Sequence, residues 1–258
     1  MIPLDALIGH TGFVGGNLLR QHDFPARFNT SNIESIAGGA FATLVFSGAQ
    51  AKKWWANANP AEDRAGIRRA LDAMRGVTAE RVVLISTIDV VPQRPGADET
   101  TDCTAQPTHP YGEHRLWLEQ ELRARYPGML TVRLPGLFGP GLRKNILFDL
   151  LHDNMVDKID PNASFQFYDL TALWSDIARA QAAGLSLVHL VPAPIRTAAI
   201  AARFFPEARL AEPPAAGSPS YDFRTRHAAL FGGSNGYIHD AEEVMRRLAA
   251  FIAAERAA

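Results

Sequence analysis

Three glycines near the start of the chain constrain the fold more than any other sequence feature. They are Gly9, Gly12 and Gly15, and they follow the short, mostly apolar segment Leu4–Ile8, which is typical of a buried strand. Apolar side chains then recur at helical spacing as far as Leu19. The pattern predicts a strand that turns through glycines into a helix.

A turn of this kind is a binding site for an anion. The first backbone N–H groups of the helix have no partner within the helix, and they point at the turn. A dinucleotide pyrophosphate is a frequent ligand there, because glycine allows both the tight turn and the close approach of phosphate. The intervening Thr11, Phe13 and Val14 are expected to contact the same ligand. The spacing differs from G-x-G-x-x-G, so a glycine-rich turn without a ligand is the alternative.

Composition excludes several other classes of protein. The 258 residues carry a net charge of −1, which gives no reason to expect a nucleic-acid or membrane partner. A single cysteine, Cys103, rules out a disulfide framework and a thiolate metal cluster, and we expect no metal. Neither a signal peptide nor a long apolar run is evident, so we expect a cytoplasmic protein.

A second strand is expected at residues 25–28, and the turn after it concerns the choice of dinucleotide. Folds that prefer NAD usually end this strand with an acid that binds the ribose 2′-hydroxyl. This chain has Asn29, Thr30 and Ser31 instead, so no carboxylate repels a 2′-phosphate. We therefore predict NAD(P) as the cofactor, with a slight preference for NADP. A plain polar turn is the alternative interpretation.

Two further strands are expected to end in small or hydroxyl residues. Residues 42–46 lead into Ser47, Gly48 and Ala49, and residues 81–85 lead into Ser86 and Thr87. Ligands of open α/β sheets bind at the carboxyl ends of the strands, so we expect both groups to lie beside the cofactor. Downstream, a helix is expected to begin at Tyr111, with Arg115 four residues later on the same face.

Together these stretches resemble the short-chain dehydrogenase/reductase superfamily, of the extended type that includes nucleotide-sugar epimerases and dehydratases. The matching residues are Gly9–Gly15, Asn32-Ile33, Ile85–Val90, Glu99 with Pro107 ahead of Tyr111, and Arg133–Gly141. The resemblance implies an α/β fold, with a Rossmann-type doubly wound parallel sheet and a small C-terminal α/β part that binds substrate.

The resemblance also implies roles for particular residues. Gly9, Gly12 and Gly15 would hold the pyrophosphate, and Asn32 with Ile33 would lie at the adenine. Thr87 would position the substrate oxygen, and Tyr111 would act as the acid/base. Pro135 belongs to the segment that runs beside the nicotinamide. The implied activity is hydride transfer at a hydroxyl or carbonyl carbon, with a nucleotide sugar as the candidate substrate.

One residue departs from the family pattern. The lysine expected four residues after the tyrosine is Arg115, which keeps the positive charge but has a larger, planar head group. The neighbouring His114 is expected to face elsewhere. Two interpretations stay open: an active NAD(P)-dependent enzyme, or a dinucleotide-binding sensor or partner protein that has lost catalysis. Arg115 and the short C-terminal half favour the second interpretation, and retention of Thr87 with Tyr111 favours the first.

The chain is expected to divide into residues 1–140, the dinucleotide-binding part, and residues 141–258, the interleaved substrate-binding part. A strand at 187–191 should rejoin the first sheet, and helices are expected at 173–182, 195–205 and 240–254. The candidate substrate contacts are Arg143, Lys144 and Asn145, whose charge and amide suit an anionic substrate, although a solvated basic turn is the alternative.

The resemblance finally implies a homodimer. In the superfamily two helices, here 63–75 and 112–126, commonly build a four-helix interface. Leu116, Leu118 and Leu122 are the apolar residues expected to pack in it.

Overall fold

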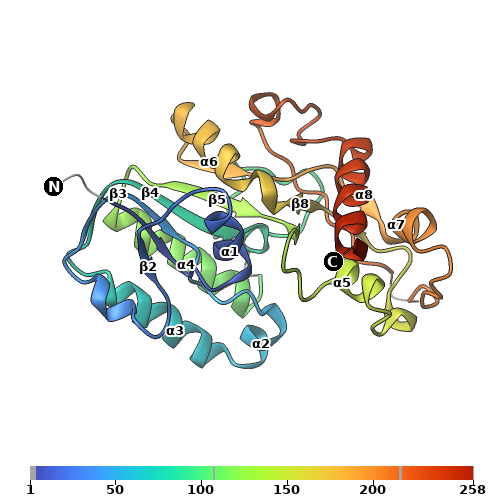
Figure 1. Cartoon of the computed structure of the whole chain (residues 1–258), viewed down its shortest axis with the longest axis horizontal. Coiled ribbons are helices and arrows are strands. Elements are labelled where there is room, and N and C mark those ends of the chain that lie inside the picture. The colour runs from blue at the N-terminus through green and yellow to red at the C-terminus, as the bar shows by residue number, and fades with distance from the viewer. Residues whose placement is uncertain (1–3, 107, 215–216, 258) are drawn as a thin grey trace.

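A six-stranded parallel sheet forms the larger lobe of the computed structural model, which describes residues 4–106, 108–214 and 217–257 (Figure 1). Pro107, part of the family resemblance, lies outside the described residues. The strands stand in the order β2-β1-β3-β4-β5-β9. Their bounds are β1 (Leu4–Ile8), β2 (Ala26–Phe28), β3 (Ala40–Phe46), β4 (Thr78–Thr87), β5 (Leu130–Leu134) and β9 (Leu187–His189).

Helices cover both faces of this sheet. On one face α3 (Pro60–Ala73) and α4 (Pro110–Arg125) pack on the strands through buried aliphatic side chains such as Ile67 and Leu122. On the other face α1 (Phe13–Leu19) and α6 (Leu173–Ala182) do the same through Leu18 and Ile177. The result is the three-layer arrangement that buries a parallel sheet on both sides, as predicted.

The strand order reverses direction between β1 and β3. After β1 the chain adds β2 on one side and then crosses to β3 on the other. The carboxyl ends of β1 and β3 therefore flank the crevice at which ligands of open α/β sheets bind. The glycine turn after β1 and the segment after β3 both lie at this crevice.

The rest of the chain forms a smaller lobe (Figure 1). It contains two short sheets, a parallel pair β6 (Gly136–Phe138) with β8 (Phe167–Asp169) and an antiparallel pair β7 (Ser164–Phe165) with β10 (Ile195–Arg196). Its helices are α5 (Ile146–Leu151), α7 (Thr197–Phe204) and α8 (Ala241–Ala257). Phe138, Phe251 and Leu248 belong to a core of its own. Within the described residues no helix is long and apolar enough to cross a membrane.

Most predicted elements of the larger lobe are present. The strand expected at 187–191 does rejoin the sheet, as β9 beside β5. Two details differ: residues 195–196 form β10 before α7 begins, and α2 (Lys53–Ala58) was not predicted. Short 3₁₀ turns complete the fold: η1 (Ile33–Ile36), η2 (Ile88–Val90), η3 (Val156–Lys158), η4 (Leu170–Ala172) and η5 (Ala228–Phe231).

The leucines of α4 that were expected at a dimer interface are instead buried within the chain. Leu118 and Leu122 are 1% and 0% exposed and belong to the core between α4 and the sheet. Leu116 is also partly buried against a core cluster. Hydrophobic spacing identifies the apolar face of a helix but not what covers it, and here the sheet of the same chain covers it. The homodimer stays a prediction.

A buried network of polar side chains connects the end of β4 with α4, β5 and β9. Glu119 and Arg133, both about 4% exposed, form a two-bonded ion pair, with Arg133 Nη2 2.7 Å from Glu119 Oε2. Ser86 donates its hydroxyl to the same carboxylate at 2.5 Å. Arg133 Nη1 also lies 3.3 Å from Nε2 of His189, whose Nδ1 lies 3.0 Å from the carbonyl of Arg224. These contacts suit a neutral imidazole with its proton on Nδ1.

The network makes stability depend on pH. Burial and, to a smaller extent, Arg133 lower the pKa of His189 from 6.5 to about 4, against the opposite effect of Glu99. In the unfolded chain His189 takes up a proton below about pH 6.5, whereas the folded chain does not until about pH 4. We therefore expect protonation of His189 in the unfolded chain to lower the free energy of unfolding as the pH is reduced from about 6.5 to about 4. The loss should approach about 1.4 kcal/mol for each pH unit.

Urea unfolding at pH 7, 5.5 and 4.5 measures this dependence. His189→Asn keeps a donor toward the Arg224 carbonyl but cannot titrate, and its loss of stability over the window should be smaller than that of the wild type. Equal losses in the two proteins would show that His189 does not cause the dependence.

Candidate active site

The glycine turn packs tightly against the end of β3. Gly9 has φ +89°, a conformation that favours glycine, and a Cβ there would lie 2.5 Å from the carbonyl oxygen of Ser47. A Cβ on Gly15 would lie 2.2 Å from the carbonyl oxygen of Gly9. Both positions therefore require glycine, because any side chain would push α1 or β3 away from β1. The turn forms a cradle of bare backbone at the crevice.

The remaining residues of the turn differ in their exposure. Thr11 and Gly12 are exposed, and a Cβ on Gly12 would meet only the Gly9 carbonyl, at 3.3 Å. Phe13 and Val14 are half-buried and pack their side chains against the core. Gly12 precedes α1 and has no side chain to cap the helix, so the first N–H groups of α1 face the turn.

The turn after β2 is held by its own side chains. The backbone N–H of Asn29 donates to Asn32 Oδ1 at 2.7 Å, and Ser31 donates to Asn29 Oδ1 through both its N–H and its hydroxyl. Thr30 is exposed, and Ile33 is 4% exposed in the core. These contacts favour the plain polar turn, although the turn carries no carboxylate at 29–32, as the NADP prediction requires.

The residues after β3, β4 and β5 differ in where their side chains go. Ser47 donates its hydroxyl to the carbonyl of Ile8 at 2.9 Å, which ties β3 to β1. Gly48 and Ala49 follow at the crevice. The Ser86 hydroxyl is engaged by Glu119 inside the protein. Pro135, directly after β5, is half-buried.

Thr87, the last residue of β4, and Tyr111, in the first turn of α4, lie close to each other. A Cβ on Gly112 would lie 2.3 Å from the carbonyl oxygen of Asp89, so only glycine lets the start of α4 approach the end of β4 this closely. The N–H of Tyr111 donates to Asn57 of α2 at 3.0 Å, which fixes this first turn. Tyr111 is 8% exposed, and the Thr87 hydroxyl is among the groups that lower the pKa of its phenol.

Arg115 shares a helix face with Tyr111, and its guanidinium carbon lies 3.9 Å from the centre of the Tyr111 ring. Arg115 is 2% exposed, and its guanidinium pairs with Asp63 of α3. Nη2 donates to Asp63 Oδ1 at 2.8 Å and to the carbonyl of Gln50, and Nη1 donates to Asp63 Oδ2. Asp63 itself is 4% exposed. The sequence did not predict Asp63 as a partner of Arg115, because no spacing rule connects two residues that are 52 positions apart.

His114 joins the same carboxylate, contrary to expectation. Its Nδ1 lies 2.8 Å from Asp63 Oδ2, and the side chain is buried. Adjacent residues of a helix point about 100° apart, which led to the prediction that His114 faces elsewhere. The carboxylate of Asp63, from the neighbouring helix α3, nevertheless contacts both side chains.

A second ion pair lies beside Thr87, and the sequence did not predict it either. Lys53 Nζ lies 2.6 Å from Asp89 Oδ1, and the Thr87 hydroxyl lies 3.4 Å from Asp89 Oδ2. His109 Nδ1 accepts from the N–H of Gly112, so its proton is on Nε2, 3.9 Å from Asp89. The ring of Tyr221, from the C-terminal part, lies 5.9 Å from the Lys53 ammonium. The side chains around Lys53 and Asp89 therefore come from both lobes.

The charges of both ion pairs act on the phenol of Tyr111. Burial raises the pKa of its phenol above the usual value, and Asp89 raises it further. The positive charges of Arg115 and Lys53 and the Thr87 hydroxyl act in the opposite direction. The phenol is consequently protonated near neutral pH and carries a proton that it can donate.

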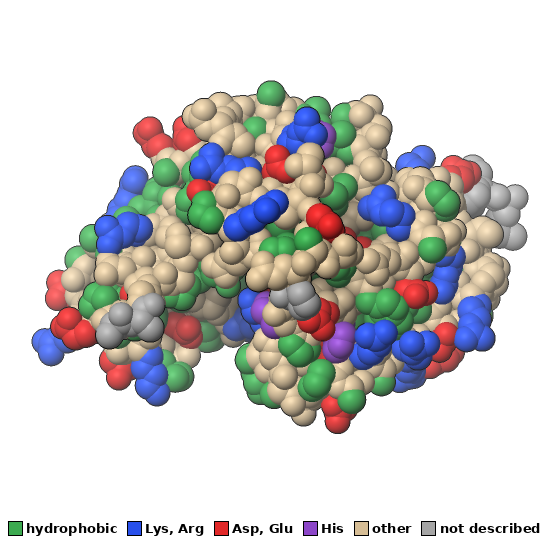
Figure 2. Space-filling model, turned by 180° about the vertical axis from the view of Figure 1, so that it is seen from behind, with side chains coloured by type: hydrophobic (Ala, Val, Ile, Leu, Met, Phe, Trp, Pro, Cys, Tyr) green, Lys and Arg blue, Asp and Glu red, His purple; other side chains and the backbone are tan. Residues whose placement is uncertain are grey.

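The three candidate substrate residues have separate surroundings. Arg143 is exposed, and Lys144 Nζ donates to the carbonyl of Ala51, which bridges the lobes. Asn145 caps α5 by accepting from the N–H groups of Leu147 and Phe148, so its side chain is engaged in the fold. Seen from behind, the surface is indented between the lobes, with basic and histidine side chains along the indentation (Figure 2).

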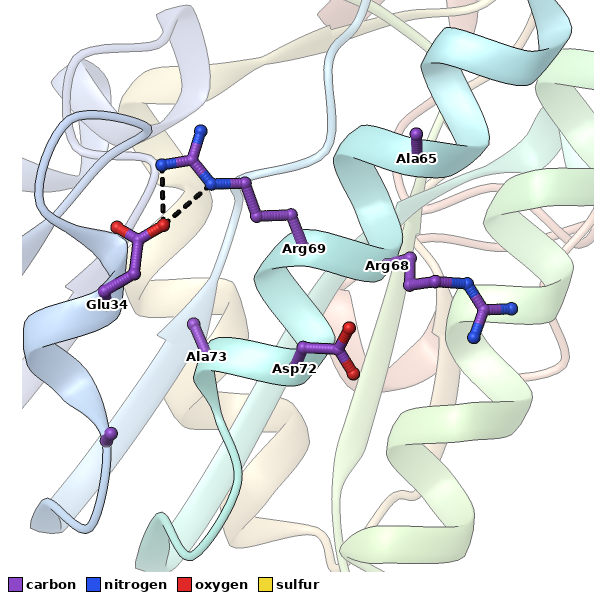
Figure 3. A pocket seen from close by; sticks show the side chains of 7 residues that line it. Glu34, Ala65, Arg68, Arg69, Asp72 and Ala73 are labelled. Atoms are coloured by element: carbon purple, nitrogen blue, oxygen red, sulfur yellow. Dashed lines mark hydrogen bonds and ion pairs between the residues drawn. The ribbon is translucent and has the colours of Figure 1, made fainter.

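A separate hollow of about 550 Å³ lies between η1 and α3 (Figure 3). It is lined by alanines and by an ion pair in which Arg69 Nη2 lies 2.6 Å from Glu34 Oε1. None of the residues that line it belongs to the group around Tyr111, which consists of Lys53, Asp63, Thr87, Asp89 and Arg115. The face of α3 that carries Arg69 and Asp72 is therefore open to solvent.

A glycine turn between the first strand and helix, at the crevice of a doubly wound parallel sheet, is characteristic of Rossmann-type dinucleotide-binding proteins. Sequence comparison identifies the family. Residues 29–163, more than half of the chain, match the NAD dependent epimerase/dehydratase family, and the chain belongs to this family. A search of curated proteins found no significant match.

Solved structures share the fold at low sequence identity. The NAD-dependent NDP-hexosamine 5,6-dehydratase TunA, involved in tunicamycin biosynthesis, has a TM-score of 0.75 at 16% identity, over 99% of this chain and 98% of that one. MoeE5 in complex with UDP-glucose and NAD gives 0.70 at 16%, over 98% of both chains. RMD from Pseudomonas aeruginosa, complexed with NADPH, gives 0.68 at 16%, over 91% and 93%. The likeness thus extends through the C-terminal half.

Proposed function

We propose that the chain is an NAD(P)-dependent enzyme that transfers hydride at a hydroxyl or carbonyl carbon of a nucleotide sugar. The observation that carries the proposal is the approach of Tyr111 to Thr87 at the ligand edge of the sheet, which Gly112 makes possible. A protein that only bound a dinucleotide would have no use for this hydroxyl pair. Membership of the family supports the same conclusion.

The cofactor site is proposed at the glycine cradle and the crevice. The bare backbone of Gly9, Gly12 and Gly15 fits a pyrophosphate, since a Cβ at the first or last position would fill the cradle with clashes. The bound nicotinamide would supply the hydride acceptor or donor. The slight preference for NADP rests only on the missing carboxylate at 29–32, since the structure of MoeE5 contains NAD and that of RMD contains NADPH.

In the proposed mechanism Thr87 and Tyr111 hold the reacting oxygen of the substrate. The Thr87 hydroxyl orients this oxygen, and the protonated phenol of Tyr111 donates to it, so that the proton can pass to the oxygen as a carbonyl becomes an alcohol. In the reverse direction the phenolate accepts the same proton. The positive charges of Arg115 and Lys53 stabilise the phenolate.

The substrate is proposed to be anionic. Lys53 and Lys144 both make contacts that join the two lobes, Lys53 with the ring of Tyr221 and Lys144 with the carbonyl of Ala51, and MoeE5 binds UDP-glucose. Incubation with UDP- and dTDP-hexoses in the presence of NAD(P), followed by proton NMR of the sugar, tests the proposal. We expect a shifted anomeric signal for at least one of them. An unchanged panel, in a protein that binds the cofactor, would contradict it.

The second candidate function is a dinucleotide-binding sensor or partner protein. The pairing of Arg115 with Asp63 favours it, because a charge neutralised by a buried carboxylate stabilises the Tyr111 phenolate less. The sensor would bind the cofactor as tightly and turn over none of the sugars.

A further inference from the structure

His10, the second residue of the glycine turn, has a ring whose orientation is fixed by the neighbouring strand. Its Nδ1 lies 3.0 Å from the carbonyl oxygen of Phe28, the last residue of β2, and the backbone N–H of Gly9 donates to the same oxygen at 2.7 Å. A carbonyl oxygen only accepts, so Nδ1 carries the proton and donates it. The ring of His10 therefore connects the glycine turn with the end of β2.

The other ring nitrogen of His10, Nε2, is free to bind a ligand. Among the described residues Nε2 has no hydrogen-bond partner and, unlike Nε of Arg115, it is not shut off from solvent. β1 and β2 are parallel, with Ile8 paired to Phe28, so the glycine turn and the end of β2 lie at the same edge of the sheet. Nε2 is thus accessible at the edge where the cofactor is proposed.

The end of β2 is the place at which a dinucleotide-binding fold recognises the 2′ position of the adenosine ribose. An acid there accepts from the 2′-hydroxyl of NAD, and a basic group nearby binds the 2′-phosphate of NADP. The turn at 29–32 has neither, and the amide oxygens of Asn29 and Asn32 accept hydrogen bonds within the turn. Of the residues at 9–15 and 29–32, His10 alone has a titratable side chain.

The elements next to His10 provide no free carboxylate that could pair with a charged ring. α1, the turn at 29–32 and the end of β3 contain no acid. Asp23, ahead of β2, pairs with Arg27 at 3.2 Å, and Glu34 of η1 pairs with Arg69 at 2.6 Å. A positive charge on His10 would therefore be stabilised chiefly by an anionic group of the ligand.

We propose that His10 determines the choice of dinucleotide: as a neutral ring it accepts a hydrogen bond at Nε2 from the 2′-hydroxyl of NADH, and it binds the 2′-phosphate of NADPH after taking up a proton at Nε2. A phosphate dianion has no hydrogen to donate, so it requires the N–H of an imidazolium. The proposal rests on the proposed function, because it requires a dinucleotide in the crevice. A preference for NADPH should then hold at low pH and be lost as the pH rises.

Isothermal titration calorimetry in two buffers with different heats of ionisation measures both the dissociation constant and the number of protons taken up on binding. We expect the wild type to take up protons with NADPH but not with NADH. Between pH 7 and 8.5 the dissociation constant for NADPH should rise about tenfold, and that for NADH should change less than about twofold. His10→Asn keeps a donor toward the Phe28 carbonyl but has no Nε2, so it should lose the proton uptake and the pH dependence.

His152→Asn is the matched control. His152 also has its Nδ1 close to a carbonyl oxygen, that of Phe148 at 2.9 Å, but it is exposed at the end of α5 in the smaller lobe. This variant should bind both dinucleotides like the wild type and take up the same number of protons with NADPH.

Proton uptake with NADPH that persists in His10→Asn would overturn the proposal, and so would equal uptake with both dinucleotides in the wild type. Equal weakening of NADH and NADPH by His10→Asn would also contradict it, because His10 would then act only on the shape of the turn. If His10→Asn does not fold, His10→Gln decides by the same comparison, since its amide cannot titrate. A wild type that binds neither dinucleotide would instead refute the proposed function, and the proposal with it.

Discussion

Replacing Tyr111 by phenylalanine is expected to lower kcat by about a hundredfold to ten-thousandfold, the range typical of a lost general acid/base. The ring would keep its buried position and its stacking on Arg115, so the structure of the site should not change. The dissociation constant for NADH should stay within about twofold, because the phenol is placed to act on the substrate oxygen. Initial rates with the nucleotide sugar found by NMR give the comparison.

Tyr126→Phe, directly after the same helix, is the matched control. The Tyr126 hydroxyl donates to the carbonyl of Val77 at 3.0 Å, away from the site. Its loss should cost about 1 kcal/mol of stability and leave kcat unchanged. A Tyr111→Phe enzyme with wild-type kcat would show that another group moves the proton, and Asp89 and His109 are the candidates.

Gly15→Ala is expected to weaken NADH binding at least about a hundredfold. The added Cβ would lie 2.2 Å from the Gly9 carbonyl oxygen, so α1 must move away from β1 and the cradle must open. Overpacking of this kind also costs about 1–3 kcal/mol of stability. Titration with NADH and urea unfolding of the variant measure the two effects.

The next residue provides the control for this prediction. Gly16 is also in α1, but a Cβ there would have no atom within 4 Å. Gly16→Ala should leave NADH binding unchanged and raise the free energy of unfolding by about 0.5–1 kcal/mol, because alanine favours a helix. Similar losses of binding in both variants would mean that the glycine turn does not hold the cofactor through its geometry.

The parts of the fold that repeat a local pattern could be predicted from the sequence. The strand, glycine turn and helix at the start of the chain follow from residues close together in sequence, and so does the Tyr111–Arg115 face. The strand at 187–191 was predicted to return to the sheet, and β9 does so.

The partners of the site residues could not be predicted in the same way. Asp63, Lys53 and Asp89 come from different elements, and only the packing of α2 and α3 on α4 brings the first two to the site. The burial of Leu118 shows the same limitation, since periodicity marks an apolar face without saying what covers it. Asn145 likewise has a side chain suited to a substrate, but it caps a helix instead.

Titration of the purified protein with NADH and with NADPH, followed by fluorescence, tests the central claim most directly. The account predicts saturable binding of a dinucleotide, tighter for NADPH if the turn at 29–32 admits the 2′-phosphate. No binding of either, in a protein that carries no dinucleotide through purification, would contradict the assignment of the glycine cradle as a cofactor site.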